Sequence, residues 1–131
     1  MTTEKKENTS LKIVTAIKNR HKSFAYASRG LQVIYKTQIN FRIQLFLFLS
    51  TLVAGLFIKL NSFEWLFIIL SFGILLSLES VNTAFEIDID LTSPNYHPYA
   101  KDVKDVAAGA VLITALMTGF GLLIIFIPKL L

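Results

Sequence analysis

Acidic and amide side chains recur at helical spacing in ESVNTAFEIDID, the segment formed by residues 79–90. On an α-helix, which turns about 100° per residue, Glu79, Asn82 and Glu86 share one face, within an arc of about 100° that also holds Thr83 and Asp90. These oxygen-rich side chains suit a hard cation such as Mg²⁺, which binds a few carboxylates and keeps other positions for water and phosphate oxygens. A carboxylate that the metal does not engage could act as general base toward an alcohol.

A second polar stretch, YHPYAKDVKDVAAGA, spans residues 96–110. Lys101 and Lys104 can supply positive charge to a phosphate, and Asp105 lies close behind them in the chain. The small residues at 107–110 allow a helix to approach its neighbour closely. A single histidine such as His97 is more often a surface loop residue than a ligand, so the residues alone assign it no role.

Three apolar runs must position these side chains. The runs cover residues 43–60, 64–87 and 106–127. At about 1.5 Å of rise per residue, each is long enough to cross a hydrocarbon core of about 30 Å. Hydrophobic residues make up 53% of the chain, above the level of about 45–50% that is usual in soluble domains. We therefore predict an all-α integral membrane protein with three transmembrane helices, the last ended by Pro128, and a loop and helix start at 91–105.

The N-terminal third is basic. Nine of the 13 Lys and Arg residues lie within the first 42 positions. After a polar tail at residues 1–9, the mixture of apolar and basic residues over 10–40 predicts an amphipathic helix on the membrane interface, in one domain with the three spans. A solvated basic tail is the alternative. The positive-inside rule places this segment and the 91–105 loop in the cytoplasm, with Lys59 and Lys129 on the outer side.

The depth of the acidic residues separates a functional site from a helix that simply becomes polar as it leaves the membrane. Asp88 and Asp90 fit that simpler explanation, because they lie nearest the end of the run. Glu79 lies about two turns deeper than Glu86. A charge near the bilayer centre costs roughly 2.5–3.5 kcal/mol, so Glu79 must face protein, water or a bound cation.

The composition also excludes several classes of function. The chain has no cysteine, which excludes disulfides and sulfur-ligated metal sites. Its net charge of +4 is concentrated beside a membrane span, where it favours anionic lipid headgroups. No nucleic-acid-binding motif accompanies it, so we expect no nucleic-acid partner.

Two extended motifs in the chain resemble those of a known family. ExxNTAxExxxD at residues 79–90, followed by YHPxAKxxKDxAAGAV at 96–111, is similar to the prokaryotic diacylglycerol kinase and undecaprenol kinase family of small, three-span membrane enzymes. The resemblance runs from about Phe24 to the C-terminus. It implies a homotrimeric bundle in the bacterial inner membrane, with active sites between protomers that transfer the γ-phosphate of ATP to a lipid hydroxyl with Mg²⁺. None of the sequence motifs of soluble kinases is present.

The resemblance also assigns roles to individual residues. It implies that Glu79 is the catalytic base and that Glu86 is a metal ligand. The positions implied to contact the nucleotide, its phosphates or the lipid are Tyr26, Arg29, Asn82, Asp90, Tyr96, Lys104 and Asp105.

The chain departs from the family pattern at Gln38. The family usually has a glutamate a few residues before the first span, where it is thought to help hold the metal, but this segment reads KTQINF at residues 36–41. A glutamine carbonyl can bind a hard cation without contributing charge. We predict that Gln38 is a neutral metal ligand. The substitution could lower the affinity for the metal or the number of metal ions bound, and it could abolish activity. Nearby Asp88 or Asp90 could instead compensate for the missing charge.

Undecaprenol is the predicted acceptor, because residues 96–111 and the C-terminal IPKLL look closer to undecaprenol kinases; diacylglycerol is the alternative. A small proton-coupled transporter would also use an intramembrane glutamate such as Glu79. It fits poorly, because three spans lack an inverted repeat and the carboxylates gather at one membrane face. The third hypothesis is a membrane scaffold that has lost catalysis through Gln38.

Overall fold

The computed structural model describes residues 22–131, and within that range every regular element is helical. The prediction of an all-α protein is confirmed for this part of the chain. The predicted tail at 1–9 and the first part of the predicted interfacial helix lie outside the described residues. The chain divides into two units, one ending at Lys36 and one formed by Thr37–Leu131, and each is described by itself.

In the first unit the described residues form a single helix that continues to residue 37. Apolar side chains such as Phe24 and Leu31 are exposed along it, as is Arg29. An interfacial location for this helix stays a prediction.

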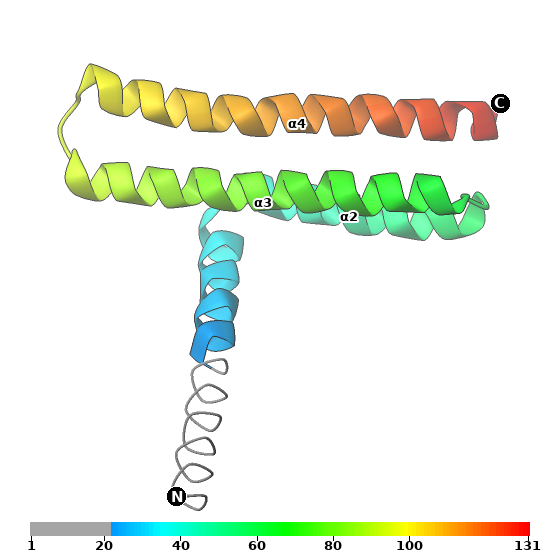
Figure 1. Cartoon of the computed structure of the whole chain (residues 1–131), viewed down its shortest axis with the longest axis horizontal. Coiled ribbons are helices and arrows are strands. Elements are labelled where there is room, and N and C mark those ends of the chain that lie inside the picture. Colours follow the sequence, from blue (N-terminus) through cyan, green and yellow to red (C-terminus); the bar gives the residue numbers. More distant parts are fainter. Residues whose placement is uncertain (1–21) are drawn as a thin grey trace, which may run out of the picture. The chain divides into compact units, whose positions relative to one another are not determined.

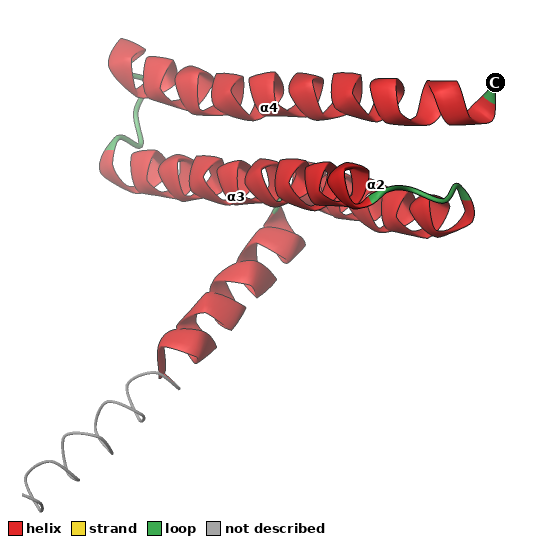
Figure 2. Cartoon of the chain, turned by 45° about the vertical axis from the view of Figure 1, so that its right-hand side comes forward, coloured by secondary structure: helices red, strands yellow, loops and turns green. Residues whose placement is uncertain are grey.

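The second unit consists of three helices, α2 (Ile39–Phe57), α3 (Ser62–Thr92) and α4 (Pro98–Leu130). They lie side by side with reversing direction, and short loops connect them (Figures 1 and 2). The middle helix in the chain, α3, packs against both α2 and α4. All three are long and apolar enough to cross a membrane.

The helices end where local backbone chemistry requires it. After Phe57 the chain turns through Lys59, which adopts a left-handed φ of 53°. Asn61 then caps α3, because its side chain accepts from the backbone N–H groups of Phe63 and Glu64, while the Glu64 carboxylate accepts from the Asn61 N–H at 2.7 Å. This reciprocal arrangement is a capping box.

Two helices extend further than the sequence suggested. Much of the 91–105 segment is helical, because α3 continues to Thr92 and α4 already begins at Pro98, a residue suited to a first helical turn. At its other end α4 passes Pro128 and ends at Leu130, rather than ending at the proline. A proline this close to a C-terminus removes little helical bonding, and the Leu131 N–H still reaches the Ile127 carbonyl at 3.3 Å.

The core is narrow and centres on α3. Ile68, Phe72 and Leu75 are buried there, and the Phe48 ring of α2 lies 5.2 Å from that of Phe72. Only 11% of the apolar stretches of α2 and α4 are buried, against 33% for α3. The outward apolar surface is therefore far larger than a soluble protein exposes, as expected of a membrane protein.

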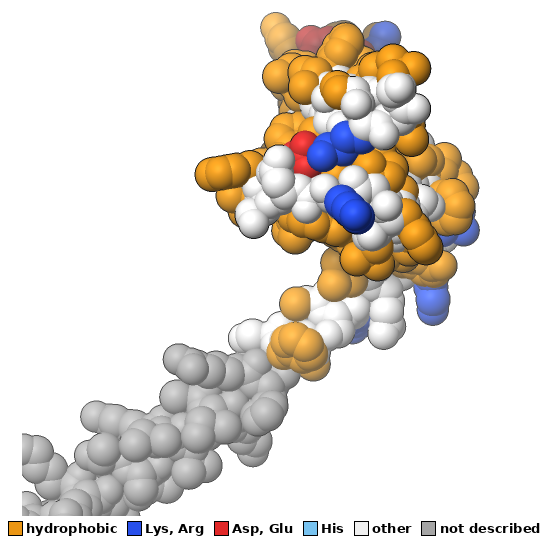
Figure 3. Space-filling view, turned by 90° about the vertical axis from the view of Figure 1, so that its right-hand side faces the viewer, with side chains coloured by type: hydrophobic (Ala, Val, Ile, Leu, Met, Phe, Trp, Pro, Cys, Tyr) orange, Lys and Arg blue, Asp and Glu red, His pale blue; other side chains and the backbone are white. Residues whose placement is uncertain are grey.

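An ion pair closes the end of the bundle that carries the α2–α3 turn. The Lys129 ammonium lies 3.1 Å from the Glu64 carboxylate and joins the last turn of α4 to the first turn of α3. Figure 3 views the molecule from this side, where an acidic side chain lies against a basic one amid hydrophobic surface. The acidic face of residues 79–90 lies toward the other end of α3.

Gly121 of α4 tests this packing. A Cβ placed there would overlap the Phe67 ring of α3, whereas one on Gly119 would meet nothing within 4 Å. Both changes to alanine gain the same helix propensity. We therefore expect Gly121→Ala to be less stable than Gly119→Ala by about 1 kcal/mol, the low end of the usual cost of overpacking, because the partly exposed Phe67 ring can move aside. Thermal denaturation in detergent micelles measures the difference, and equal melting temperatures would contradict the described α3–α4 contact.

Candidate active site

Two amide–carboxylate pairs join α2 to α3. The Gln38 Nε2 donates to the Glu86 Oε2 at 3.0 Å, and the Gln44 Nε2 donates to the Glu79 Oε2 at 3.3 Å. Because the two helices are antiparallel, amides about two turns apart on one helix meet carboxylates about two turns apart on the other. We call these two pairs the amide–carboxylate ladder.

Gln38 can reach across because its side chain is not used locally. It occupies the N-cap position of α2 in an extended conformation and makes no side-chain capping bond. The side chain instead bonds Glu86, which is half-buried on α3. The short break in helix at Gln38 thus coincides with a contact between Gln38 and Glu86, the two residues predicted to bind a metal.

Glu86 is held on both of its oxygens. In addition to Gln38, Asn82 donates its Nδ2 to the Glu86 Oε1 at 3.0 Å, from one turn earlier on the same helix. Hydrogen bonds to a charged group contribute about 1.5–3 kcal/mol each. The carboxylate is therefore oriented by two neutral donors.

Three of the four buried polar residues within residues 22–131 lie on the predicted acidic face; the fourth is Thr118 on α4. Glu79 is 2% exposed, Asn82 8% and Thr83 1%. The Thr83 hydroxyl donates to the Glu79 backbone carbonyl at 2.9 Å. A carboxylate buried this deeply requires a hydrogen-bond partner, which Gln44 supplies.

Two oxygens in the same cluster lack a donor. The Gln44 Oε1 and the Asn82 Oδ1 are buried and have no hydrogen-bond partner within the described residues. Residues 22–131 contain no group of three or more His, Cys, Asp and Glu side chains close enough to hold a metal. The donor set nevertheless fits a hard divalent cation, because unpartnered amide oxygens lie beside two carboxylates and such a cation also accepts water and phosphate oxygens.

A second polar cluster lies at the α3–α4 turn. The Lys104 ammonium forms an ion pair with the Asp90 carboxylate, which links the two helices. Both residues line a hollow of about 310 Å³ together with Tyr96, His97 and Lys101. Positive charge held beside an open hollow suits a phosphate group.

Three of the predicted site residues are not brought to either cluster. Asp105 is exposed on α4, whereas Tyr96, though exposed at the turn, borders the hollow with Asp90 and Lys104. Tyr26 and Arg29 are exposed on the helix of the first unit, whose position relative to the site is not defined. Their assigned roles stay predictions.

Sequence reasoning missed Gln44. It is an amide within the apolar run IQLFLFLSTL at residues 43–52. A polar side chain in such a run is costly unless it finds a partner, and this isolation is the signal that could have identified it.

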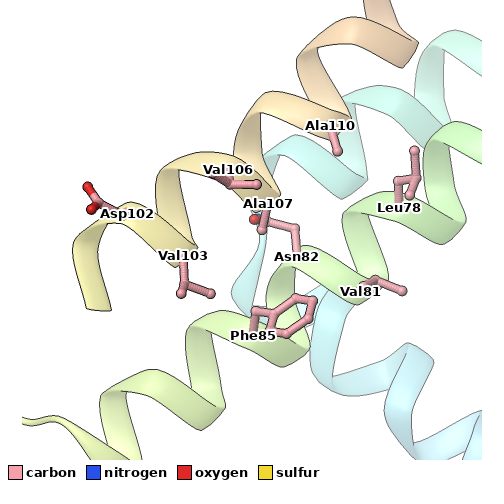
Figure 4. A pocket seen from close by; sticks show the side chains of 9 residues that line it. All are labelled: Leu78, Val81, Asn82, Phe85, Asp102, Val103, Val106, Ala107 and Ala110. Atoms are coloured by element: carbon pink, nitrogen blue, oxygen red, sulfur yellow. The ribbon is translucent and has the colours of Figure 1, made fainter. Parts of the chain in front are cut away.

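An apolar groove of about 420 Å³ runs between α3 and α4, and Asn82 of the buried acidic face is one of its lining residues. Figure 4 shows its walls, formed by side chains such as Val81 and Phe85 on α3 and Val106 and Ala110 on α4, with Asn82 pointing from α3 toward α4. An apolar chain in this groove would lie next to a residue of the polar cluster.

Known proteins are similar in sequence to this chain over most of its length. Residues 25–126 match the prokaryotic diacylglycerol kinase family. The undecaprenol kinase of Bacillus subtilis is 40% identical over 109 residues, which cover 83% of this chain and 89% of that protein. A diacylglycerol kinase of Synechocystis sp. is 39% identical over 95 residues, covering 72% of this chain but only 54% of that longer protein. A Helicobacter pylori diacylglycerol kinase is 29% identical over 103 residues, 79% of this chain and 80% of that protein.

Gln38→Glu tests the hydrogen bond from the neutral Gln38 amide to Glu86. The change replaces an amide donor 3.0 Å from the Glu86 carboxylate with a second negative charge. Like charges at this distance repel unless a cation lies between them. We therefore expect a melting temperature below that of the wild type in EDTA, recovered by millimolar Mg²⁺, in detergent-solubilised protein.

Gln38→Met is the matched control. It removes the donor without adding charge, so Mg²⁺ should raise its melting temperature no more than that of the wild type. An equal Mg²⁺ response in Gln38→Glu and Gln38→Met would show that residue 38 does not face Glu86.

Proposed function

We propose that this chain, which belongs to the prokaryotic diacylglycerol kinase family, transfers the γ-phosphate of ATP to the hydroxyl group of undecaprenol. Its membership confirms the family predicted from the two motifs and makes the protein a lipid kinase. The undecaprenol kinase of Bacillus subtilis, which this chain matches over most of both sequences, supports the acceptor. Diacylglycerol is the alternative, because other relatives carry that name.

The observation that carries the proposal is that two carboxylates on α3, those of Glu79 and Glu86, are each hydrogen-bonded by amide groups. Glu79 is buried and bonded only through neutral groups, so its charge is not cancelled by a nearby cation among its described partners. On the proposed mechanism, Glu79 accepts the proton of the lipid hydroxyl. The alcohol oxygen forms a bond to the γ-phosphorus, the bond from that phosphorus to the bridging oxygen breaks, and ADP leaves.

Glu86, with the amide oxygens of Asn82 and Gln38, would hold Mg²⁺. When bound, this ion neutralises charge on the phosphates and on the transferred group. The unpartnered Asn82 Oδ1 supports this assignment. The hydrogen bonds from Gln38 and Asn82, one to each oxygen, hold the Glu86 carboxylate in one orientation.

Lys104 is proposed to pair with the nucleotide phosphates. Its present partner is Asp90, which is largely exposed, so a phosphate can replace or share that partner. Tyr96 borders the same hollow. Tyr26, Arg29 and Asp105 are proposed as further nucleotide or lipid contacts, completed when chains assemble.

We propose a homotrimer in the bacterial inner membrane with the N-terminus and the site facing the cytoplasm. The excess of basic residues on the N-terminal side of the bundle supports this orientation. The large exposed apolar surface of α2 and α4 supports contact with lipid and with neighbouring copies. The groove beside Asn82 is the proposed place for the apolar chain of the acceptor.

Transfer of labelled phosphate from ATP to lipid tests the function. Purified wild-type protein should phosphorylate undecaprenol in preference to diacylglycerol when both are supplied in separate micelles with Mg²⁺. Glu79→Gln and Glu86→Gln should lower the rate by at least about 100-fold, because each removes a charge used by the reaction. Thin-layer chromatography separates the two lipid products.

Glu64→Gln serves as the control, because it changes a glutamate of the same helix at the opposite end of the bundle. It should keep the wild-type transfer rate per folded molecule. If Glu79→Gln and Glu86→Gln were both as active as Glu64→Gln, the assigned site would be wrong. A wild-type protein that labels neither lipid would reject the activity itself.

Lys104→Met should raise the KM for ATP by about 10- to 100-fold, the loss expected for a charge-assisted bond to a phosphate. Its KM for lipid should change little, because the ion pair with Asp90 lies at the α3–α4 turn rather than in the apolar groove. Lys129→Met, which removes a lysine at the other end of the bundle, is the control. Equal KM values for ATP in both variants would rule out Lys104 as a phosphate contact.

A further inference from the structure

Gln44 has a contact with the site that the proposed mechanism does not use. It lies near the start of α2, in a largely apolar run, and its side chain is half-buried. Its Nε2 bonds Glu79, the proposed base, across the α2–α3 contact. Packing alone does not explain a glutamine at this position, because an apolar side chain would avoid the cost of burying an amide.

The amide is suited to holding a base. A lysine or arginine in its place would form an ion pair with Glu79 and stabilise its negative charge against taking a proton. A neutral amide donates one hydrogen bond and orients the carboxylate with a much smaller effect on its basicity. The bond engages the Oε2 of Glu79 and leaves the Oε1 as the oxygen that Gln44 does not hold.

The other half of the same amide is incomplete. The Gln44 Oε1 is buried and has no donor within the described part of the chain. Leaving a buried acceptor without a donor is unfavourable, and such atoms require a reason, often a bound group. Because Nε2 and Oε1 belong to one amide, a donor that reaches Oε1 lies close to the Glu79 carboxylate. A hydroxyl group can supply that donor, whereas an ester or ether oxygen cannot.

We infer that Gln44 is a positioning residue that holds Glu79 through its Nε2 and receives, on its Oε1, a hydrogen bond from the hydroxyl group of the lipid acceptor. This inference rests on the proposed function, because it requires Glu79 to be the base. The hydroxyl binds to Gln44 before reaction and then gives its proton to Glu79 as the oxygen bonds to phosphorus. Gln44 itself is chemically unchanged.

Gln44→Met tests the inference, because methionine has a similar length and lacks both the donor and the acceptor. We expect kcat to fall and the KM for the lipid to rise, with a combined loss in kcat/KM for lipid of about 10- to 100-fold, as is typical for groups that orient a reacting residue. The KM for ATP should stay within about twofold of the wild type. Gln44→His should recover much of the activity, since a neutral imidazole also offers one donor and one acceptor.

Thr51→Val is the matched control on α2, because the Thr51 hydroxyl is exposed and bonds only its own helix at Leu47. It should keep both KM values and kcat. Melting temperatures of all variants separate stability from catalysis. A Gln44→Met protein that melts earlier but keeps kcat and the lipid KM would overturn the inference and leave Gln44 a structural residue.

The two levels of the argument fail in different ways. An inactive Glu79→Gln together with a fully active Gln44→Met rejects the role of Gln44 and leaves the proposed function standing. A fully active Glu79→Gln rejects the proposed base, and the inference about Gln44 falls with it. A rise in the KM for ATP alone in Gln44→Met would also contradict the inference, because it would place Gln44 at the nucleotide.

Discussion

The burial of Glu79 is the constraint that organises this bundle. A carboxylate that is 2% exposed in an apolar helix needs a donor, and Gln44 on α2 supplies it. The bond from Gln38 to Glu86 repeats this solution about two turns away. A rotation of α2 by one residue, about 100°, would turn both amides away from both carboxylates. The ladder therefore fixes the register of α2 on α3, which apolar packing alone would specify less strictly.

Carboxylates at the ends of the bundle and carboxylates deeper within it have different kinds of partner. Lysines pair with acidic residues at the two ends of the bundle, through Lys104 and Asp90 at one end and Lys129 and Glu64 at the other. The two deeper carboxylates receive only amide donors. This division matters for chemistry, because a carboxylate paired with lysine is already neutralised. The carboxylates of the ladder have no ion pair with a lysine or arginine among the described residues, which on the proposed mechanism leaves them available to a cation or a proton.

The sequence predicted those parts of the protein that depend on one helix at a time. Hydropathy indicates the three long helices, and the helical repeat places Glu79, Asn82 and Glu86 on one face without knowledge of any neighbour. Gln44 was missed because its significance depends on which residue of α3 lies opposite, and that follows from inter-helix register. Helix lengths were underestimated for a related reason: a span is recognised by its apolar residues, whereas α3 and α4 continue as polar helix toward their shared turn.

Gln38 shows how a departure from the family pattern can be compatible with the same chemistry. A glutamate at this position would face Glu86 at hydrogen-bonding distance, and the two charges would repel until a cation or a proton joined them. With glutamine, Glu86 is already oriented by Gln38 and Asn82 before any ligand arrives. The site then holds less negative charge, so a cation gains less from the protein alone and more from phosphate oxygens. On the proposed mechanism this favours binding of the metal together with the nucleotide rather than ahead of it.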